Sequence, residues 1–301
     1  MSTTNSAPWR LMSIHAHPDD ESSKGAPTTA RYVDAGVHAV LVCATGGEEG
    51  DIINKALKDR PEIEENLKEV RRQELAHATR IIGYATTHML GYRDSGMRES
   101  EANDHGECFW AAPIEESTAR FAQLIRDERP HVMISYAPAR GGYDHPDHER
   151  VHVITDPAIL MAADPEANLS GEPWQVAKLY YSTWSKTRLL AINAKYEELE
   201  LTSPFDEKWL SRPGHDHLVT TKILVGPWWN RRREALLAHA TQVDPDEKFW
   251  FGLPAEAEVA AYPYEDFERV WSKVPVPEGT EGDLFAGLDG WTGIPPIEDA
   301  E

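Results

Sequence analysis

Apolar residues in the first part of the chain form short continuous runs separated by segments compatible with helices. Residues 9–15 and 37–44 are two such runs of strand length, and residues 21–35 between them are compatible with a helix that stops at Gly36. A continuous apolar run is typical of a strand buried on both faces of a parallel sheet. The order strand, helix, strand therefore predicts a right-handed parallel crossover.

The same alternation continues to about residue 165. Apolar residues in 62–82 recur at three- and four-residue steps, which predicts an amphipathic helix closed by Gly83. Further on, the pattern predicts a short strand at 88–90, a helix at 114–128, a strand at 130–136 and a helix at 145–161. This alternation predicts a Rossmann-like, doubly wound, mostly parallel α/β sheet, in which ligands lie beyond the carboxyl ends of the strands.

The pattern loosens after residue 165, where 178–183 and 218–225 predict strands and 228–239 predicts a helix. We expect residues 1–165 to form the catalytic domain and residues 166–273 to form a C-terminal α/β extension that lines part of the substrate pocket. Residues 274–301 carry many Pro, Gly and acidic residues, so we expect an extended acidic tail.

Charge and composition narrow the range of partners. The formal charge of -21 comes from 51 acidic against 30 basic residues, without a basic run, which argues against nucleic acid and anionic membranes. No apolar run approaches the roughly 18 residues of a membrane helix, and the first residues lack a signal-peptide pattern. With two cysteines, Cys43 and Cys108, expected to be unpaired, the sequence favours a cytoplasmic protein. A small-molecule substrate is the expected partner; oligomeric state has no signal in the sequence.

The tripeptide His-Pro-Asp occurs twice, at 17–19 and 145–147, each time after a predicted strand and before a predicted helix. The first copy continues to Asp20 and the second to His148. Both loops are expected to face one crevice, because parallel strands end at the same edge of the sheet. Zinc hydrolases use three ligands from His, Asp or Glu and leave a fourth position for water. The sequence therefore predicts a metal site.

Each motif alone also has an ordinary explanation. Asp19 and Asp20 suit a helix N-terminus, where acidic side chains stabilise the helix dipole, and His145 and His148 suit an exposed first turn. Their joint occurrence at corresponding strand ends favours a site. His152 follows His148 by one helical turn, and we expect it to support or pack rather than to bind metal.

Four segments resemble the motifs of the zinc-dependent N-acetylglucosaminyl deacetylase superfamily, the LmbE-like or PIG-L fold. They are AHPDDE at 16–21, GGEEG at 46–50, RDSG at 93–96 and GGYDHPDH at 141–148. The resemblance covers the whole chain, and the segments at 215–221 and 239–251 are similar to the mycothiol branch of the superfamily. It implies hydrolysis of an amide on a glucosaminyl-inositol.

The resemblance also implies roles for individual residues. His17, Asp20 and His148 would bind zinc, Asp19 would be the general base, and His145 would be the general acid or the oxyanion stabiliser. Ferrous iron remains an alternative to zinc, because His and Asp ligands suit both ions.

Further residues have both a functional and an ordinary interpretation. Asp147 would orient His145 or a metal ligand, or is simply an aspartate at a helix start. Tyr143 would donate to the scissile carbonyl, or is a packed loop aromatic. Arg71 and Asp94 match positions that grip sugar and inositol hydroxyls, although Arg71 is otherwise an exposed helix arginine with Arg72 beside it.

Asp51 and Glu48 follow the second predicted strand and are weaker candidates for contact with the substrate. Lys24 stands where the resemblance implies a lysine in the amidases and a small polar residue in the deacetylases, so it favours the amidases; a snorkelling helix lysine is the alternative. The aromatic residues at 228–229 and 249–251 line a pocket for apolar thioether groups or belong to the core.

Two other classes of function remain as alternatives. A non-catalytic sugar-binding module with a structural metal is disfavoured, because such sites close all four positions with protein ligands. A two-metal phosphatase is disfavoured because it needs more bridging carboxylates and imidazoles than these loops offer.

Overall fold

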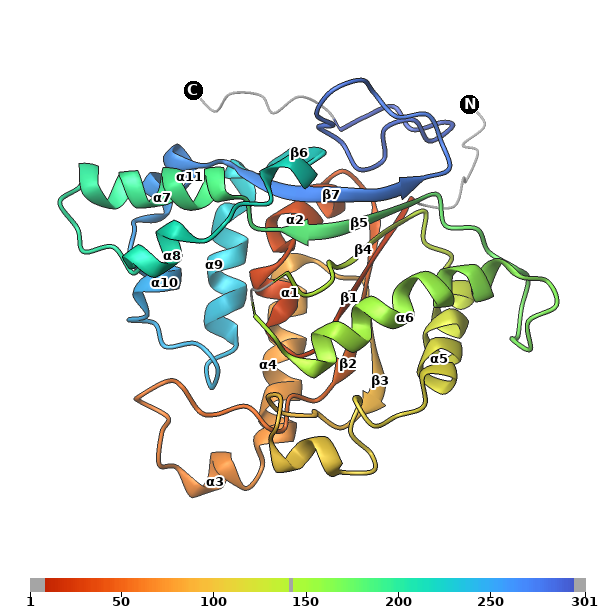
Figure 1. Ribbon diagram of the computed structural model, residues 1–301, viewed down its shortest axis with the longest axis horizontal. Coiled ribbons are helices and arrows are strands. Elements are labelled where there is room, and N and C mark those ends of the chain that lie inside the picture. Colours follow the sequence, from red (N-terminus) through yellow and green to blue (C-terminus); the bar gives the residue numbers. More distant parts are fainter. Residues whose placement is uncertain (1–8, 141–142, 295–301) are drawn as a thin grey trace.

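The computed structural model describes residues 9–140 and 143–294, so Gly141 and Gly142 of the second motif lie outside the described residues. Seven strands form one sheet in the order β3-β2-β1-β4-β5-β7-β6 (Figure 1). The strands are β1 (Arg10–His15), β2 (His38–Thr45), β3 (Thr86–Tyr92), β4 (Val132–Tyr136), β5 (Lys178–Thr183), β6 (Thr221–Leu224) and β7 (Tyr264–Ser272). β1 to β5 pair in parallel, and β7 is antiparallel to both of its neighbours. The expected Rossmann-like, mostly parallel sheet with a C-terminal extension is confirmed.

Helices cover both faces of the sheet, which explains the continuous apolar runs (Figure 1). On one face, Met12 and Ile14 of β1 belong to the same core cluster as Phe121 of α5 (Ile114–Glu128) and Val151 of α6 (Pro146–Ala163). On the other face, Leu11 clusters with residues of α2 (Ala26–Asp34) and α9 (Trp229–Ala238). α4 (Leu67–Ile82) packs against α9 on this second face.

Two predicted helices are each split in two. The segment expected at 21–35 forms α1 (Asp20–Ser23) and α2, because Lys24 is extended and Gly25 has a φ of 92°. The carboxylate of Glu265 accepts from the backbone N–H groups of Gly25 and Thr28, and so caps α2 from a distant strand. The segment expected at 62–82 forms α3 (Pro61–Glu64) and α4.

Several elements of the C-terminal extension were not predicted from the sequence. The extension contains β7, α7 (Lys186–Glu198), α8 (Glu207–Ser211), α10 (Lys248–Phe251) and α11 (Ala255–Ala261). Short 3-10 helices η1 (Glu101–Asp104), η2 (Asp216–Leu218) and η3 (Gly226–Trp228) complete the elements. No apolar alternation marked β7 in the sequence, because the buried positions in its first half include the charged residues Glu265 and Asp266.

The division of the chain at residues 165 and 273 stays a prediction. Residues 274–294 have no helix or strand of their own, yet Leu284 and Phe285 are buried in the core. Glu281 is also buried and lies 2.5 Å from Nζ of the buried Lys178 on β5. This part of the expected tail is therefore fixed to the sheet. The helices in the described part of the chain are all too short or too polar to span a lipid bilayer.

Candidate metal centre and active site

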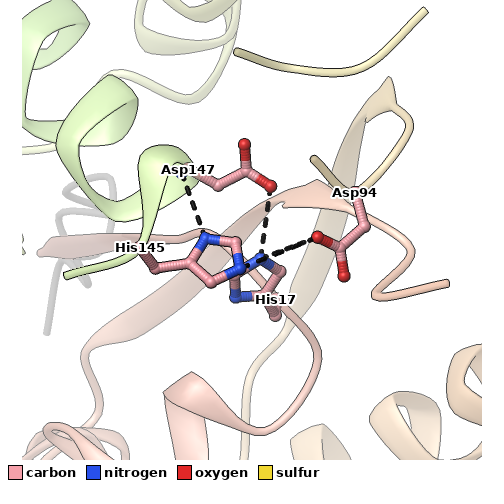
Figure 2. Close-up of side chains that lie close together, drawn as sticks. All are labelled: His17, Asp94, His145 and Asp147. Atoms are coloured by element: carbon pink, nitrogen blue, oxygen red, sulfur yellow. Dashed lines mark hydrogen bonds and ion pairs between the residues drawn. The ribbon is translucent and has the colours of Figure 1, made fainter. Parts of the chain in front are cut away.

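The two His-Pro-Asp loops lie together at the carboxyl ends of β1 and β4. His17 follows β1, His145 is the N-cap of α6 after β4, and Asp94 follows β3. Figure 2 shows His17, Asp94, His145 and Asp147 pointing toward one another. The sequence-based expectation that both loops face one crevice agrees with this placement.

Local hydrogen bonds explain the shape of each loop. In the first, the backbone N–H of His17 donates to Oδ2 of Asp20 at 3.0 Å, and this carboxylate opens α1. In the second, Nδ1 of His145 accepts from the backbone N–H of Asp147 at 3.2 Å, and Pro146 fills the first helical position. The second loop therefore presents the rest of the His145 ring to the crevice.

The first potential metal group is His17, Asp20 and His148, whose ligand atoms all lie within 4.8 Å of one another. Oδ2 of Asp20 lies 3.2 Å from Nε2 of His148 and 3.5 Å from Nδ1 of His17. Nε2 of His148 is buried and has no hydrogen-bond partner among the described residues. A buried nitrogen that lies beside a carboxylate without forming a hydrogen bond suits a metal ligand.

A second group of His17, Asp94, His145 and Asp147 also meets the 4.8 Å criterion. Nε2 of His17 lies 3.3 Å from Oδ2 of Asp147 and 3.5 Å from Oδ1 of Asp94, while Nε2 of His145 lies 3.9 Å from the same Asp94 oxygen. The two groups share only His17. A histidine that binds metal through one ring nitrogen commonly donates from the other to a carboxylate. That pattern assigns Nδ1 of His17 to the first group and Nε2 to Asp147.

The electrostatics of the crevice favour a cation. Burial alone would lower the pKa of His17, but Asp147, Asp20 and Asp94 raise it well above its usual range. Burial alone would raise the pKa of Asp20, but Lys24 and His148 hold it well below its usual range. Three carboxylates thus surround one buried imidazole, and a divalent ion would compensate negative charge gathered there.

His145 has its Nε2 available as a donor. Because Nδ1 accepts from a backbone N–H, the proton of the neutral ring is assigned to Nε2. Burial and the nearby charge of His17 lower the pKa of His145 to about 4, which favours the neutral ring. The geometry therefore provides a neutral N–H donor in the crevice.

Asp19 differs from its neighbours because its side chain is 30% exposed. Its backbone has the unusual φ of 117°. Nη2 of Arg71 donates to Oδ2 of Asp19 at 2.9 Å and to the carbonyl of Pro18 at 2.6 Å, and Nη1 donates to the carbonyl of Gly47. Burial raises the pKa of Asp19 in spite of this arginine. The interpretation of Arg71 as an exposed helix arginine is wrong: it is buried, whereas Arg72 is exposed.

Asp147 contacts the predicted ligand His17 with its carboxylate rather than His145. Ser95 donates to this carboxylate from its backbone N–H at 3.0 Å and also from its hydroxyl. Sequence analysis missed Ser95, which is fully buried. Of the two functional interpretations of Asp147, the geometry agrees with orientation of a metal ligand.

The remaining candidates lie around the crevice. Tyr143 is exposed, and its ring lies nearly parallel to that of His145, with centroids 5.9 Å apart. Lys24 places Nζ 2.5 Å from Oδ1 of Asp20. Glu48 accepts from the backbone N–H of Asp94 at 3.0 Å, whereas the exposed Asp51 belongs to neither metal group.

Tyr136 is a further residue that sequence analysis missed, because the last residue of a predicted strand is not marked as part of a site by the local sequence. Its ring stacks on His148 with centroids 4.5 Å apart and an angle of 11°. Its hydroxyl accepts from the backbone N–H of Ala16 at 3.1 Å. One side chain therefore contacts both loops.

The Rossmann-like fold, with a buried His/Asp cluster at the carboxyl ends of its strands, is consistent with a metal-dependent hydrolase. The family model described as PIG-L, GlcNAc-PI de-N-acetylase, matches residues 12–159. With relatives of 38% identity across nearly the whole chain, this protein belongs to that family of metal-dependent deacetylases and amidases.

Two curated relatives have different activities at the same identity. Mycothiol S-conjugate amidase of Streptomyces coelicolor is 38% identical over 289 residues, which cover 93% of this chain and 97% of the relative. A 1D-myo-inositol 2-acetamido-2-deoxy-alpha-D-glucopyranoside deacetylase of Thermobifida fusca is 38% identical over 287 residues, which cover 92% and 99%. Overall identity therefore does not separate the amidases from the deacetylases.

Solved structures agree on the fold. The conserved protein TT1542 from Thermus thermophilus has a TM-score of 0.57 and 22% identity and covers 89% of this chain and 98% of its own. N,N'-diacetylchitobiose deacetylase from Pyrococcus horikoshii has a TM-score of 0.58 and 16% identity, and the match covers 88% of this chain and 84% of the deacetylase. The hydratase GalB from Pseudomonas putida has a TM-score of 0.58 and 15% identity, and the match covers 89% of this chain and 99% of GalB. Because a hydratase shares this fold, the fold alone does not determine the reaction, which depends on the residues of the site.

Proposed function

We propose that this protein is a zinc-dependent amidase that cleaves the amide bond of mycothiol S-conjugates. The products are glucosaminyl-inositol and an N-acetylcysteine S-conjugate. The observation that carries the choice of the amidase is Lys24, which reaches the proposed metal ligand Asp20 with Nζ at 2.5 Å and is 30% exposed. A lysine that contacts a proposed metal ligand would lie near the reacting amide, whereas a snorkelling helix lysine would point to solvent.

The donor set supports one metal ion held by His17, Asp20 and His148. Two imidazoles and a carboxylate match the ligands of catalytic zinc sites, and the unpartnered Nε2 of His148 gives the ion a place. A zinc ion there would supply a Lewis acid and would lower the pKa of water. Ferrous iron fits the same donors, so the cell's supply decides between the two ions.

Asp19 would take the proton from the attacking water. Its Oδ2 is bound by Arg71, while Oδ1 has no hydrogen-bond partner among the described residues. An oriented carboxylate with one free oxygen at a partly exposed position is suited to this role. Arg71 would then orient the carboxylate of Asp19. A contact of Arg71 with the sugar hydroxyls is a second proposed role.

His145 would donate a hydrogen bond from Nε2 to the oxygen of the scissile carbonyl, and the departing amine would receive the proton that Asp19 takes from the water. The assigned tautomer supports this hydrogen bond, because a neutral N–H donor is already fixed by the backbone of Asp147. Tyr143, whose ring lies beside His145, would add a second donor to the carbonyl.

The substrate's sugar and inositol hydroxyls would meet Asp94, Arg71 and, further out, Glu48 and Asp51. Asp94 is fixed by its neighbours, since Oδ1 accepts from the backbone N–H of Gly96 at 2.8 Å. Of the aromatic residues considered for the apolar S-substituent, Trp229 belongs to the buried core instead. The S-substituent would lie toward the half-buried aromatic residues at 249–251.

A second candidate is the deacetylase that removes acetate from N-acetylglucosaminyl-inositol, because relatives with this activity are equally similar to the chain. The purified, zinc-loaded protein should be assayed on a mycothiol-bimane conjugate and on N-acetylglucosaminyl-inositol. We expect the larger kcat/KM on the conjugate. Faster turnover of the acetylated sugar would overturn the amidase proposal and support the deacetylase.

A further inference from the structure

Asp19 has a backbone conformation that an aspartate rarely adopts. Its φ of 117° and ψ of -28° belong to a region that favours glycine. Such a conformation persists only where surrounding contacts hold it. Arg71 donates to the side chain of Asp19 and to the carbonyl of Pro18. The backbone N–H of Asp19 needs a different partner.

Glu21 holds this N–H. Its Oε2 accepts from the backbone N–H of Asp19 at 2.9 Å, across two residues of the same loop. The other oxygen, Oε1, pairs with Nε2 of His239 at 2.7 Å and accepts from the hydroxyl of Ser22 at 2.5 Å. Glu21 and His239 are both fully buried. A continuous set of hydrogen bonds therefore connects His239 to the backbone of Asp19.

His239 comes from a distant part of the chain. It is the C-cap of α9, and its carbonyl accepts from the backbone N–H groups of Gln242 and Val243 at 2.9 and 3.0 Å. α9 packs against α1 and α4, which are the helices that carry the first loop and Arg71. The C-terminal extension thus reaches beneath the loop that carries Asp19.

We propose that His239 is a positioning residue, which acts through Glu21 to fix the backbone of Asp19 so that its carboxylate faces the attacking water. The proposal rests on the assignment of Asp19 as the general base. Two supports would then orient the base, Arg71 at the carboxylate and the Glu21–His239 pair at the N–H. Among the described residues, the ring of His239 forms its hydrogen bond with Glu21 and with none of the proposed ligands.

A pair of amide substitutions tests this proposal. The amide nitrogen of glutamine reaches the place of Nε2 of a histidine, whereas that of asparagine ends near Nδ1. We expect His239→Asn to lower kcat about 10- to 100-fold, because small misplacements of a reacting group have effects of this size. KM and zinc content should stay unchanged, and His239→Gln should recover most of the lost kcat.

Thr241→Val is the matched control. Thr241 lies in the same segment and fixes it to α4 through Glu74, with its backbone N–H and hydroxyl donating at 2.8 and 2.7 Å. The control removes a buried hydrogen bond from that segment without touching Glu21. Equal losses of kcat in Thr241→Val and His239→Asn would overturn the proposal, because both would then report general loosening.

A crystal structure of His239→Asn separates this proposal from the proposed function. We expect the φ of Asp19 to leave its positive value, or its carboxylate to leave Arg71. An unchanged Asp19 would overturn the positioning role even if the enzyme is an amidase. If the wild type cleaves neither substrate, the proposed function fails, and the structure of the variant still decides whether His239 holds this loop.

Discussion

Oδ2 of Asp147 lies 3.3 Å from Nε2 of His17, so a residue of the second loop contacts a proposed metal ligand of the first. Asp147 is itself held by Ser95, which follows β3. This contact fixes the His17 ring and directs its other nitrogen, Nδ1, toward Asp20. The orientation of the proposed metal centre therefore depends on a carboxylate that does not belong to the proposed ligands.

Replacing Asp147 by asparagine should weaken metal binding. The amide keeps the size of the side chain but removes the negative charge beside Nε2 of His17. Loss of such a partner of a metal ligand typically lowers metal affinity about 10- to 100-fold. Zinc affinity should be measured by competition with a chromophoric chelator. Asp144→Asn is the control, because Asp144 lies in the same loop but pairs with Arg98 at the surface. Equal affinity in Asp147→Asn and wild type would contradict the role of Asp147.

Replacing Asp19 by asparagine should lower kcat about 10²- to 10⁴-fold, the usual contribution of a general base. Zinc content should remain that of the wild type, because Asp19 is not among the proposed ligands. Steady-state kinetics on the preferred substrate together with metal analysis provide both readouts. Asp127→Asn on the exposed face of α5 serves as the control. If kcat survives in Asp19→Asn, another group takes the proton.

Replacing Lys24 by serine should move the substrate preference toward the acetylated sugar. Loss of the contact with Asp20 removes the residue that distinguishes the amidases in the family resemblance. We expect the ratio of kcat/KM on the conjugate to kcat/KM on the acetylated sugar to fall about tenfold, equivalent to about 1.4 kcal/mol. Lys208→Ser on α8 should leave this ratio unchanged. A ratio that stays constant in Lys24→Ser would remove the main support for the amidase.

Replacing Glu281 by glutamine should destabilise the protein. Glu281 is the buried counter-ion of Lys178 and also pairs with Arg269 at 3.0 Å. Removing one partner of a buried ion pair costs about 3–5 kcal/mol, because the other charge stays buried. Urea unfolding measures this change. In the double variant Lys178→Met with Glu281→Leu, only part of the loss should be recovered, because Arg269 still loses its partner. A single variant as stable as the wild type would contradict the account.

The sequence predicted the parts of the fold that depend on local pattern. The apolar runs around Met12 and Val40 identify strands buried on both faces, and the repeated His-Pro-Asp identifies two loops at one edge. The split between α1 and α2 was not predictable locally, because the carboxylate that caps α2 belongs to Glu265, far away in the sequence.

The same limit applies to the site. The candidate ligands are placed together as the motifs suggest, but the buried contacts of Ser95, Tyr136 and His239 depend on packing between distant elements. Ser95 and His239 lie in segments that resemble the family, but these segments do not indicate which side chains the two residues contact. Tyr136 carries no local signal of its function. Only the three-dimensional structure relates these side chains to the crevice.

The most direct test of the central claim is a crystal structure of the zinc-loaded protein with anomalous diffraction at the zinc edge. The account predicts one ion bound by Nδ1 of His17, a carboxylate oxygen of Asp20 and Nε2 of His148, at about 2.0–2.2 Å. Asp94, His145 and Asp147 should not bind it. An ion held instead by Asp94, His145 and Asp147, or no ion between the two loops, would contradict the account.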